Sequence, residues 1–433
     1  MVFGLDPFWL ATTVFALTYL LVIADRINRA IIALLGAGVM VVSGGLSQEE
    51  AIRGIDFNTI ALLTGMMVLV AIARRCGMFE YLAVWSAKIG RARPSAILAL
   101  LSVVTAVVSA FLDNVTTVLL IVPVTLAIAR HLESPPYPFL FAEVFASNIG
   151  GTATLIGDPP NIIIGSAAHL SFNDFVLHLT PVIIVVMAVQ LVATHLIWGA
   201  RMGASAAARE RVMALDLRGL IVDPQLMRAS LSVLAAVVAA FVFAGPLHLQ
   251  PGTIALFGAA VLMLLHNLEH RRQRERQTAR VSETFGEVDW ITIFFFLGLF
   301  VIVHGIDVAG VIDLAAQWLI GLTGDDLRAA ALTILWGSAL LSAIVDNIPF
   351  VAAMIPLIRG IGPHFSGAGQ ADVLWCALSL GACLGGNGTL IGASANLAVA
   401  GIDFRFTTYM RHAFGLMLIS IAICHVYLRL RYL

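Results

Sequence analysis

Residues 147–161 read SNIGGTATLIGDPPN, a polar, helix-breaking stretch that lies between apolar runs. It holds three glycines, two prolines, two asparagines and an aspartate. Proline removes a backbone donor and glycine lowers helix stability, while asparagine and threonine offer neutral donors and acceptors. In an apolar chain, such a stretch predicts a membrane helix that unwinds where it is buried in protein or lines a watery cavity.

The composition predicts a polytopic membrane protein. Hydrophobic residues make up 60% of the chain, charged residues make up 12%, and the mean hydropathy is +0.96. A length of 433 residues leaves room for roughly ten to twelve spanning helices and for no large soluble domain. The formal net charge of -1 provides no basic field for nucleic acid. The first apolar run lacks a basic flank and a small-residue cleavage site, so we interpret it as a spanning helix, not a signal peptide.

The apolar runs form two series. The first series covers 8–24, 30–45, 58–73, 95–112, 115–130, 139–168 with the polar interruption inside it, and 175–199. The second series covers 229–245, 252–267, 290–304, 328–345, 348–361, 373–402 with another interruption, and 408–428.

The two series are related by an internal repeat. FLDNVTTVLLIVP at 111–123 matches IVDNIPFVAAMIP at 344–356, and we call the spacing from Asp113 to Asp346 the hairpin offset. GTATLIG at 151–157 matches GNGTLIG at 386–392, and we call the spacing from Gly151 to Gly386 the loop offset. A two-residue insertion between the landmarks accounts for the difference between the offsets, and the paired motifs indicate two copies of one structural unit.

Charge patterning predicts that the copies cross the membrane in opposite directions. Residues 74–93, in repeat one, hold five basic residues and one acidic residue, whereas the equivalent residues 305–327 hold four aspartates and no Lys or Arg. The positive-inside rule places the first segment in the cytoplasm and the second outside. The arginine-rich segment 266–287 fits this topology, as do Arg26 and Arg29, whereas the C-terminal arginines then fall outside.

These patterns predict an all-α polytopic membrane protein with two inverted-topology repeats, re-entrant hairpins and unwound transmembrane helices. Such repeats are typical of secondary transporters, which hold their substrate where the repeats meet. We divide the chain into N-terminal helices (1–50), transport repeat one (51–200), connecting helices with a basic cytoplasmic linker (201–287), and inverted transport repeat two (288–433).

The polar interruptions and the paired Asp-Asn motifs supply the candidate site. Asp113 and Asp346 fall at hairpin tips, where each acid either binds a proton or cation or only caps the next helix. Asp158 has Ala393 as its repeat partner, so it is either a one-sided ion or proton site or a turn residue. The candidate substrate- or ion-binding residues are Asp113, Asn114, Thr116, Thr117, Asn148, Thr152, Thr154, Asp158, Asn161, Asp346, Asn347, Asn387, Thr389, Ser394 and Asn396.

The motifs FLDNVTTVLLIVPVTLAIA, SNIGGTATLIGDPPNIIIG and VDNIPFVAAMIP resemble the ion transporter superfamily, in the branch that joins arsenite and antimonite efflux permeases with the melanosomal P protein. The resemblance covers about residues 50–200 and 285–430. It implies a secondary transporter whose hairpin tips and unwound helices form the site. Related sodium-coupled dicarboxylate carriers have a Ser-Asn-Thr triplet at these tips, whereas this chain has DNV and DNI, which favours proton coupling or a cation site.

The expected function is proton-coupled efflux of arsenite or antimonite across the inner (cytoplasmic) membrane, with Asp113, Asp346 or Asp158 taking the proton. A sodium/proton antiporter and a sodium-coupled carboxylate or anion symporter remain as alternatives. An enzyme is not expected, because HExxH, GxSxG and GxxxxGK motifs are absent from the sequence. The four cysteines have neither disulfide nor zinc spacing, and we expect no cofactor or metal. The resemblance also implies that some systems carry a separate ATPase subunit, for which segment 266–287 is a candidate docking surface.

Overall fold

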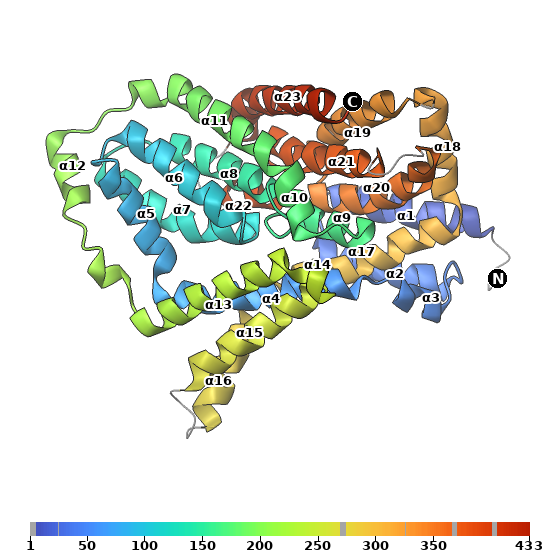
Figure 1. The fold of residues 1–433 in the computed structure, drawn as a ribbon, viewed down its shortest axis with the longest axis horizontal. Helices are drawn as coiled ribbons and strands as arrows, with labels where there is room; N and C mark the ends of the chain where they lie inside the picture. The colour runs from blue at the N-terminus through green and yellow to red at the C-terminus, as the bar shows by residue number, and fades with distance from the viewer. Residues whose placement is uncertain (1–5, 25, 269–273, 325, 366–369, 401–404) are drawn as a thin grey trace.

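A computed structural model describes residues 6–24, 26–268, 274–324, 326–365, 370–400 and 405–433. Every regular element in these ranges is a helix, as the sequence predicts (Figure 1). Seven of the described helices are long and apolar enough to span a membrane, and shorter apolar helices accompany them. The chain is therefore an all-α membrane protein.

The two predicted repeats appear as two matching series of helices. The first consists of α4 (Phe57–Ala73), α5 (Met78–Ile89), α6 (Pro94–Ser109), α7 (Asn114–His131), α8 (Tyr137–Thr152), α9 (Pro159–Ala168), α10 (Phe172–His178) and α11 (Thr180–Ile197). The second consists of α17 (Trp290–Val308), α18 (Val311–Thr323), α19 (Leu327–Ser342), α20 (Asn347–Ile361), α21 (Gln370–Gly385), α22 (Ser394–Ala400) and α23 (Phe406–Arg431).

Matching glycines show that the repeats share backbone details. Gly77 before α5 and Gly310 before α18 are separated by the hairpin offset, and both adopt left-handed conformations with φ of 81° and 76°. A residue with a Cβ is strained in that region. The charge pattern treats segments 74–93 and 305–327 only as loops. In the structure each segment contains a helix, and the two helices start at equivalent turns.

Each repeat folds a hairpin against a broken helix. In repeat one, α6 and α7 form the hairpin, and α8 and α9 are the two halves of the interrupted helix; α19, α20, α21 and α22 are their counterparts. A Cβ on Gly150 would lie 2.1 Å from the carbonyl oxygen of Ala106, and a Cβ on Gly385 would lie 2.5 Å from that of Ala339. Glycine is therefore needed in both repeats, because the broken helix touches the hairpin backbone.

Each repeat packs against the helix that precedes the other repeat in the chain. α2 (Arg29–Val42) packs on α17 of repeat two, and α15 (Pro251–Asn267) packs on α4 of repeat one. Gly298 faces the backbone of Ala33, and Gly65 faces the backbone of Ala255. Because Gly65 and Gly298 are themselves separated by the hairpin offset, α2 and α15 are structural counterparts.

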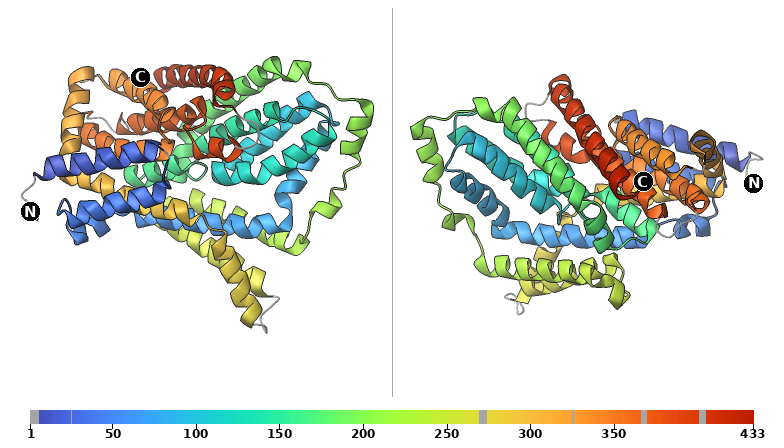
Figure 2. Two further views of the ribbon diagram at one scale, coloured as in Figure 1. Left: turned by 180° about the vertical axis from the view of Figure 1, so that it is seen from behind. Right: turned by 45° about the horizontal axis from the view of Figure 1, so that its top comes forward.

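The remaining helices connect or cover these units. They are α1 (Pro7–Ala24), α3 (Gln48–Arg53), α12 (Ala206–Met213), α13 (Pro224–Val242), α14 (Ala244–Leu247) and α16 (Arg274–Gly286). Figures 1 and 2 show α12 on one flank, and α15 with α16 projecting from the body. The segment 266–287, predicted as a linker, is largely helical in its described part, while 269–273 lie outside the described residues.

Ion pairs join the two basic segments that are predicted to be cytoplasmic. Arg75, at the end of α4, lies 3.2 Å from Glu283 and 2.8 Å from Glu287. Arg74 lies 3.3 Å from Glu287. Segments 74–93 and 266–287 thus lie on the same face of the molecule, as the topology requires, although the domain boundaries and the sidedness stay predictions.

Candidate functional site

The two hairpin tips and the two helix breaks meet at one buried place. Asn114 and Asn347 are the first residues of α7 and α20, directly after the tips. Residues 153–158 separate α8 from α9, and residues 386–393 separate α21 from α22. Asn148, Asn161, Asn387 and Asn396, which come from the broken helices, are each at most 1% exposed.

Amide side chains from both repeats form a hydrogen-bonded cluster centred on Asn148. The Nδ2 of Asn148 donates to the Oδ1 of Asn387 (2.8 Å) and to the Oδ1 of Asn396 (2.9 Å). The Nδ2 of Asn114 donates to the Oδ1 of Asn148 (2.9 Å). We call Asn114, Asn148, Asn387 and Asn396 the amide cluster. It joins repeat one to repeat two through neutral groups that are both donors and acceptors.

Asp158 lies beside the amide cluster and is fully buried. Its carboxylate accepts hydrogen bonds from the Nδ2 of Asn114 (3.2 Å) and from the Nδ2 of Asn347 (3.4 Å to each oxygen). The donors come from the tips of both hairpins. A buried carboxylate without a cationic partner is costly, so an acid in such a position is a functional candidate.

The unwound loops are tied down by asparagine and threonine side chains. Asn161 donates to the carbonyls of Thr152 (3.1 Å) and Thr154 (2.9 Å), and Asn396 donates to those of Gly386 and Thr389 (2.8 Å each). These bonds satisfy backbone groups that the broken helices leave unpaired, as burial in a membrane protein requires.

The predicted threonines mostly serve this scaffold. Thr154 donates to the carbonyl of Ala110, and Thr389 donates to that of Ala343 at 2.5 Å, which fastens each loop to a hairpin. Thr152 donates to the carbonyl of Asn148 within α8 (2.7 Å). Thr116 provides a backbone N–H for the cap of α7. Thr117 is fully buried, and its hydroxyl has no hydrogen-bond partner among the described residues.

The two tip aspartates occupy different environments. Asp113 caps α7 by accepting from the backbone N–H of Thr116 (2.9 Å), and it forms no ion pair with the described part of the chain. Asp346 caps α20 through the N–H of Ile348 (3.3 Å). It also accepts from the hydroxyl of Ser394 (2.9 Å) and forms an ion pair with Arg29 (2.8 Å).

Three further residues belong to the site, although the sequence did not single them out as ligands. Arg29 was expected in a cytoplasmic loop, but its guanidinium reaches Asp346. The Ser379 hydroxyl donates to the Oδ1 of Asn161 (2.6 Å), and the Cys383 thiol lies 3.5 Å from the same oxygen. Cys383 could have been found, because it follows Asn148 by the loop offset and so occupies the equivalent position of the repeat.

A second buried acid lies along α8. Glu143 is 1% exposed and accepts a hydrogen bond from Thr125 of α7 (2.5 Å), while its other oxygen has no partner among the described residues. Its repeat partner, at the loop offset, is Leu378. Like Asp158, this acid therefore exists in repeat one alone.

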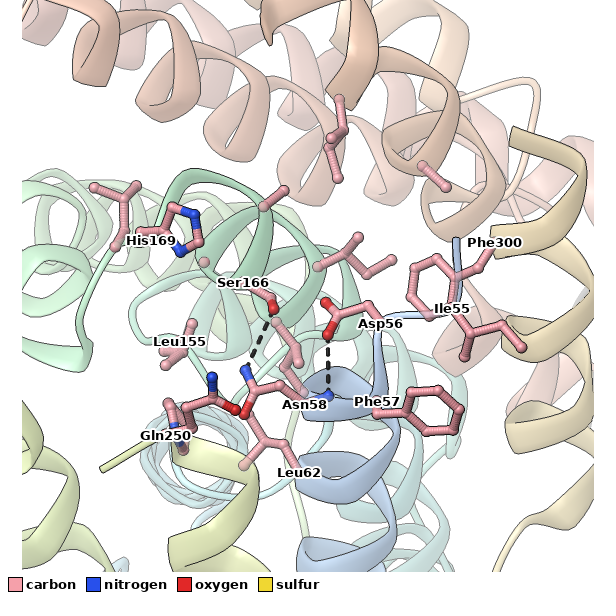
Figure 3. Close-up of a pocket in the computed structure, with 18 of the residues that line it drawn as sticks. Ile55, Asp56, Phe57, Asn58, Leu62, Leu155, Ser166, His169, Gln250 and Phe300 are labelled. Carbon is pink, nitrogen blue, oxygen red and sulfur yellow. Dashed lines mark hydrogen bonds between the residues drawn. The ribbon is translucent and has the colours of Figure 1, made fainter. Parts of the chain in front are cut away.

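An open cavity of about 640 Å³ lies beside this site, between the start of α4 and the end of α17. The polar residues of its lining include Asp56, Asn58 and His304. In Figure 3, Asn58 and Ser166 point toward each other and share a hydrogen bond of 3.3 Å. The lining also includes Leu155 and Ile162, which neighbour the polar residues of the first helix break. The start of α4 and the end of α17, which both line this cavity, are predicted by the charge pattern to lie outside.

The described residues contain no group of three or more His, Cys, Asp or Glu side chains that could hold a metal ion. The described site offers hydrogen bonding by amides and hydroxyls, the ion-paired carboxylate of Asp346, and the carboxylates of Asp113 and Asp158.

Comparisons with known proteins identify a transporter. A family model described as "Citrate transporter" matches residues 19–381. An uncharacterized transporter of Mycobacterium tuberculosis is 43% identical over 98% of this chain and 98% of its own length. The human P protein is 33% identical over 97% of this chain, which spans 59% of the P protein. The solved Alcanivorax borkumensis YdaH transporter shares the fold, with a TM-score of 0.61, 13% identity and 98% of each chain covered.

Proposed function

Since this chain belongs to the citrate transporter family, a family of membrane transporters, we propose that it is a proton-coupled secondary transporter that exports a small, neutral, oxygen-rich solute. Arsenite and antimonite, as uncharged trihydroxides, are the proposed solutes, and the inner (cytoplasmic) membrane is the proposed location. Repeat one and repeat two would alternate in exposing a site between them to either side of the membrane.

The observation that supports this proposal most directly is the position of Asp158. Its carboxylate is buried and is held by amide groups from both hairpin tips, at 3.2 to 3.4 Å. Protonation changes the carboxylate from an acceptor into a donor. A proton on Asp158 would therefore alter its bonds to Asn114 and Asn347 together, and so couple protonation to the relative position of the repeats.

The amide cluster suits a neutral solute better than an anion. Its members are uncharged, and the guanidinium of Arg29 is already paired with Asp346. An anion beside Asp158 would face a buried negative charge whenever that residue is ionised. Hydroxyl groups of a trihydroxide could instead exchange hydrogen bonds with amides and be released quickly.

Citrate is the second candidate solute, and the description of the matching family favours it. A carboxylate solute would need compensation for its charge, either by protons or by a bound cation. Sodium as the coupling ion is the corresponding alternative to the proton. These candidates differ in the net charge that enters the site.

The test is transport by the purified chain in proteoliposomes under an imposed proton gradient, with arsenite, citrate and sodium compared side by side. Uptake of arsenite that follows the proton gradient supports the proposal. Uptake of citrate alone would replace the proposed solute, and uptake that requires a sodium gradient would replace the coupling ion.

An ATPase subunit that docks on segment 266–287 is a separate proposal. The helix α16 projects from the body and so offers a surface for a partner (Figure 1). Gradient-driven transport by the chain alone would show that such a subunit is not needed for turnover.

A further inference from the structure

Arg29 connects three parts of repeat two. Its guanidinium donates to the Oδ2 of Asp346 (2.8 Å), to the hydroxyl of Ser394 (2.8 Å) and to the hydroxyl of Thr292 (3.2 Å). It also lies over the ring of Phe295, 5.2 Å from the centroid, where a cation is attracted by the aromatic face. Its partners come from the tip of the second hairpin, from the first residue of α22 and from α17.

These contacts resemble the coordination of a cation by oxygen ligands. A carboxylate and two hydroxyls converge on one positive group that is mostly buried, with 24% of the Arg29 side chain and 14% of the Asp346 side chain exposed. Ser394 also donates to Asp346 (2.9 Å), which closes the cluster. We call Arg29, Asp346, Ser394 and Thr292 the arginine cluster.

Repeat one keeps the acid and the threonine of this cluster but not the arginine or the serine, because Ser394 is aligned at the loop offset with Pro159, which has no hydroxyl. Asp113 is the counterpart of Asp346, and Thr59 is the counterpart of Thr292, both at the hairpin offset. Gly65 faces Ala255 and Gly298 faces Ala33, so these two alanines occupy equivalent positions in α15 and α2. By the same alignment, Pro251 is the counterpart of Arg29. Proline carries no charge, and Asp113 has no ion pair within the described ranges.

The two repeats differ in charge in opposite senses. Repeat one carries the extra acid, Asp158, where repeat two has Ala393. Repeat two carries the extra base, Arg29, where repeat one has Pro251. The negative charge of Asp346 is therefore neutralised by the chain itself, whereas Asp158 in repeat one forms no ion pair with the described residues and is left for a diffusible cation.

We propose that Arg29 is a built-in counter-ion that fills the cation site of repeat two, so that the coupling cation binds in repeat one alone. This inference rests on the proposed function, because it specifies where a cation-coupled transporter takes its ion. Since the guanidinium is covalently attached and always charged, it cannot be exchanged during turnover. Repeat two then acts as a permanently occupied half-site.

The experiment compares sodium binding by the purified protein and by Arg29→Gln, with radioactive Na⁺ at mildly alkaline pH. Removing the guanidinium frees the carboxylate of Asp346 and the hydroxyls of Ser394 and Thr292. We expect Arg29→Gln to bind one more Na⁺ per chain than the parent protein, and Arg29→Gln/Asp346→Asn to lose that additional ion. Equal Na⁺ stoichiometry in the parent and in Arg29→Gln would overturn the inference.

Two variants control for charge and folding. Arg53→Gln removes an arginine that pairs with Glu49 at an exposed position, and it should leave Na⁺ binding unchanged. Arg29→Lys keeps the cation, so it should show the parent stoichiometry. If Arg29→Gln unfolds on extraction, Arg29→Lys still decides: an additional Na⁺ in this variant overturns the inference, and parent stoichiometry supports it.

Binding and transport results separate this inference from the proposed function. An additional Na⁺ in Arg29→Gln would support the counter-ion even if arsenite were not transported. If the parent protein transports arsenite with the proton gradient but Arg29→Gln binds no additional Na⁺, the proposed function is supported and the counter-ion inference is wrong.

Discussion

The three aspartates of the site show how different surroundings give one residue type different roles. Asp113 accepts from a backbone N–H as a helix cap, Asp346 is neutralised by Arg29, and Asp158 is held only by neutral groups. The carboxylate of Asp346 is occupied by its ion pair with Arg29, and that of Asp113 by the cap of α7. Asp158 is therefore the acid best placed to take up a proton during turnover.

Substituting Asp158 separates coupling from capping. We expect Asp158→Asn to stop proton-driven transport and to fold normally, because the amide is isosteric with the carboxyl group. We expect Asp113→Ala to keep coupling but to lower stability by about 0.5–2 kcal/mol, the usual cost of a lost helix cap. Transport in proteoliposomes and thermal unfolding in detergent measure the two effects. Coupled transport by Asp158→Asn would contradict the assignment.

Cys383 tests whether the proposed solute binds through oxygen or through sulfur. The thiol lies near Asn161, at 3.5 Å, and the other cysteines, Cys76, Cys376 and Cys424, are buried elsewhere. We expect Cys383→Ser to transport arsenite at the parent rate, because a hydroxyl can replace the thiol as a donor. Loss of arsenite transport with binding of protons retained would indicate capture by sulfur and contradict the neutral trihydroxide.

At the scale of elements, the site depends on how closely each broken helix approaches its hairpin. α8 packs on α6, and α21 packs on α19, with glycine at both contacts. The unwound loops then return to the hairpins through the hydroxyls of Thr154 and Thr389. This close approach brings Asn114 and Asn347, at the tips, within reach of Asp158.

Alanine at the contact glycine should separate these elements. A Cβ on Gly150 would lie 2.1 Å from the carbonyl oxygen of Ala106, so we expect Gly150→Ala to lower stability by about 1–3 kcal/mol, as overpacking does. Gly337→Ala is the matched control, because a Cβ there has nothing within 4 Å. Thermal unfolding of the purified variants measures both, and equal unfolding temperatures would show that the contact is dispensable.

At the scale of the whole molecule, the fold places two equivalent units around one site, with helices exchanged between them. α2 precedes repeat one in the chain but packs on repeat two, where it delivers Arg29 to Asp346. α15 precedes repeat two and packs on repeat one. Because of this exchange, α2, which precedes repeat one in the chain, supplies the positive charge of Arg29 to repeat two.

The inverted topology predicts that α16 is accessible from the cytoplasmic side of the membrane and α18 from the outer side. Ser282 in α16 and Gln317 in α18 are not buried, whereas the four native cysteines are. We expect a membrane-impermeant thiol reagent to label Ser282→Cys only from the cytoplasmic side and Gln317→Cys only from the outer side. Intact cells and inside-out vesicles provide the two exposures. Labelling of both variants from one side would contradict the inverted topology.

The sequence by itself determined the membrane class, the helix breaks and the paired motifs, and it predicted most residues of the candidate site. These features follow from local composition and from motifs that recur at a fixed offset, as with Asn161 and Asn396. The resemblance to the P protein is confirmed by the relatives found, whereas the arsenite branch and the coupling ion stay predictions. Asp158 stood out because its counterpart in the repeat is Ala393.

Only the tertiary structure decided which side chains meet. Arg29 and Asp346 are 317 residues apart, and Asn148 and Asn396 are 248 apart. No local pattern encodes such pairs, because they depend on the packing of α2 on α17 and of the two broken helices on each other. For the same reason the sequence predicted Arg29 to be a loop residue and treated Asp113 and Asp346 as equivalent. In the folded protein Asp346 is neutralised by Arg29, whereas Asp113 is a helix cap.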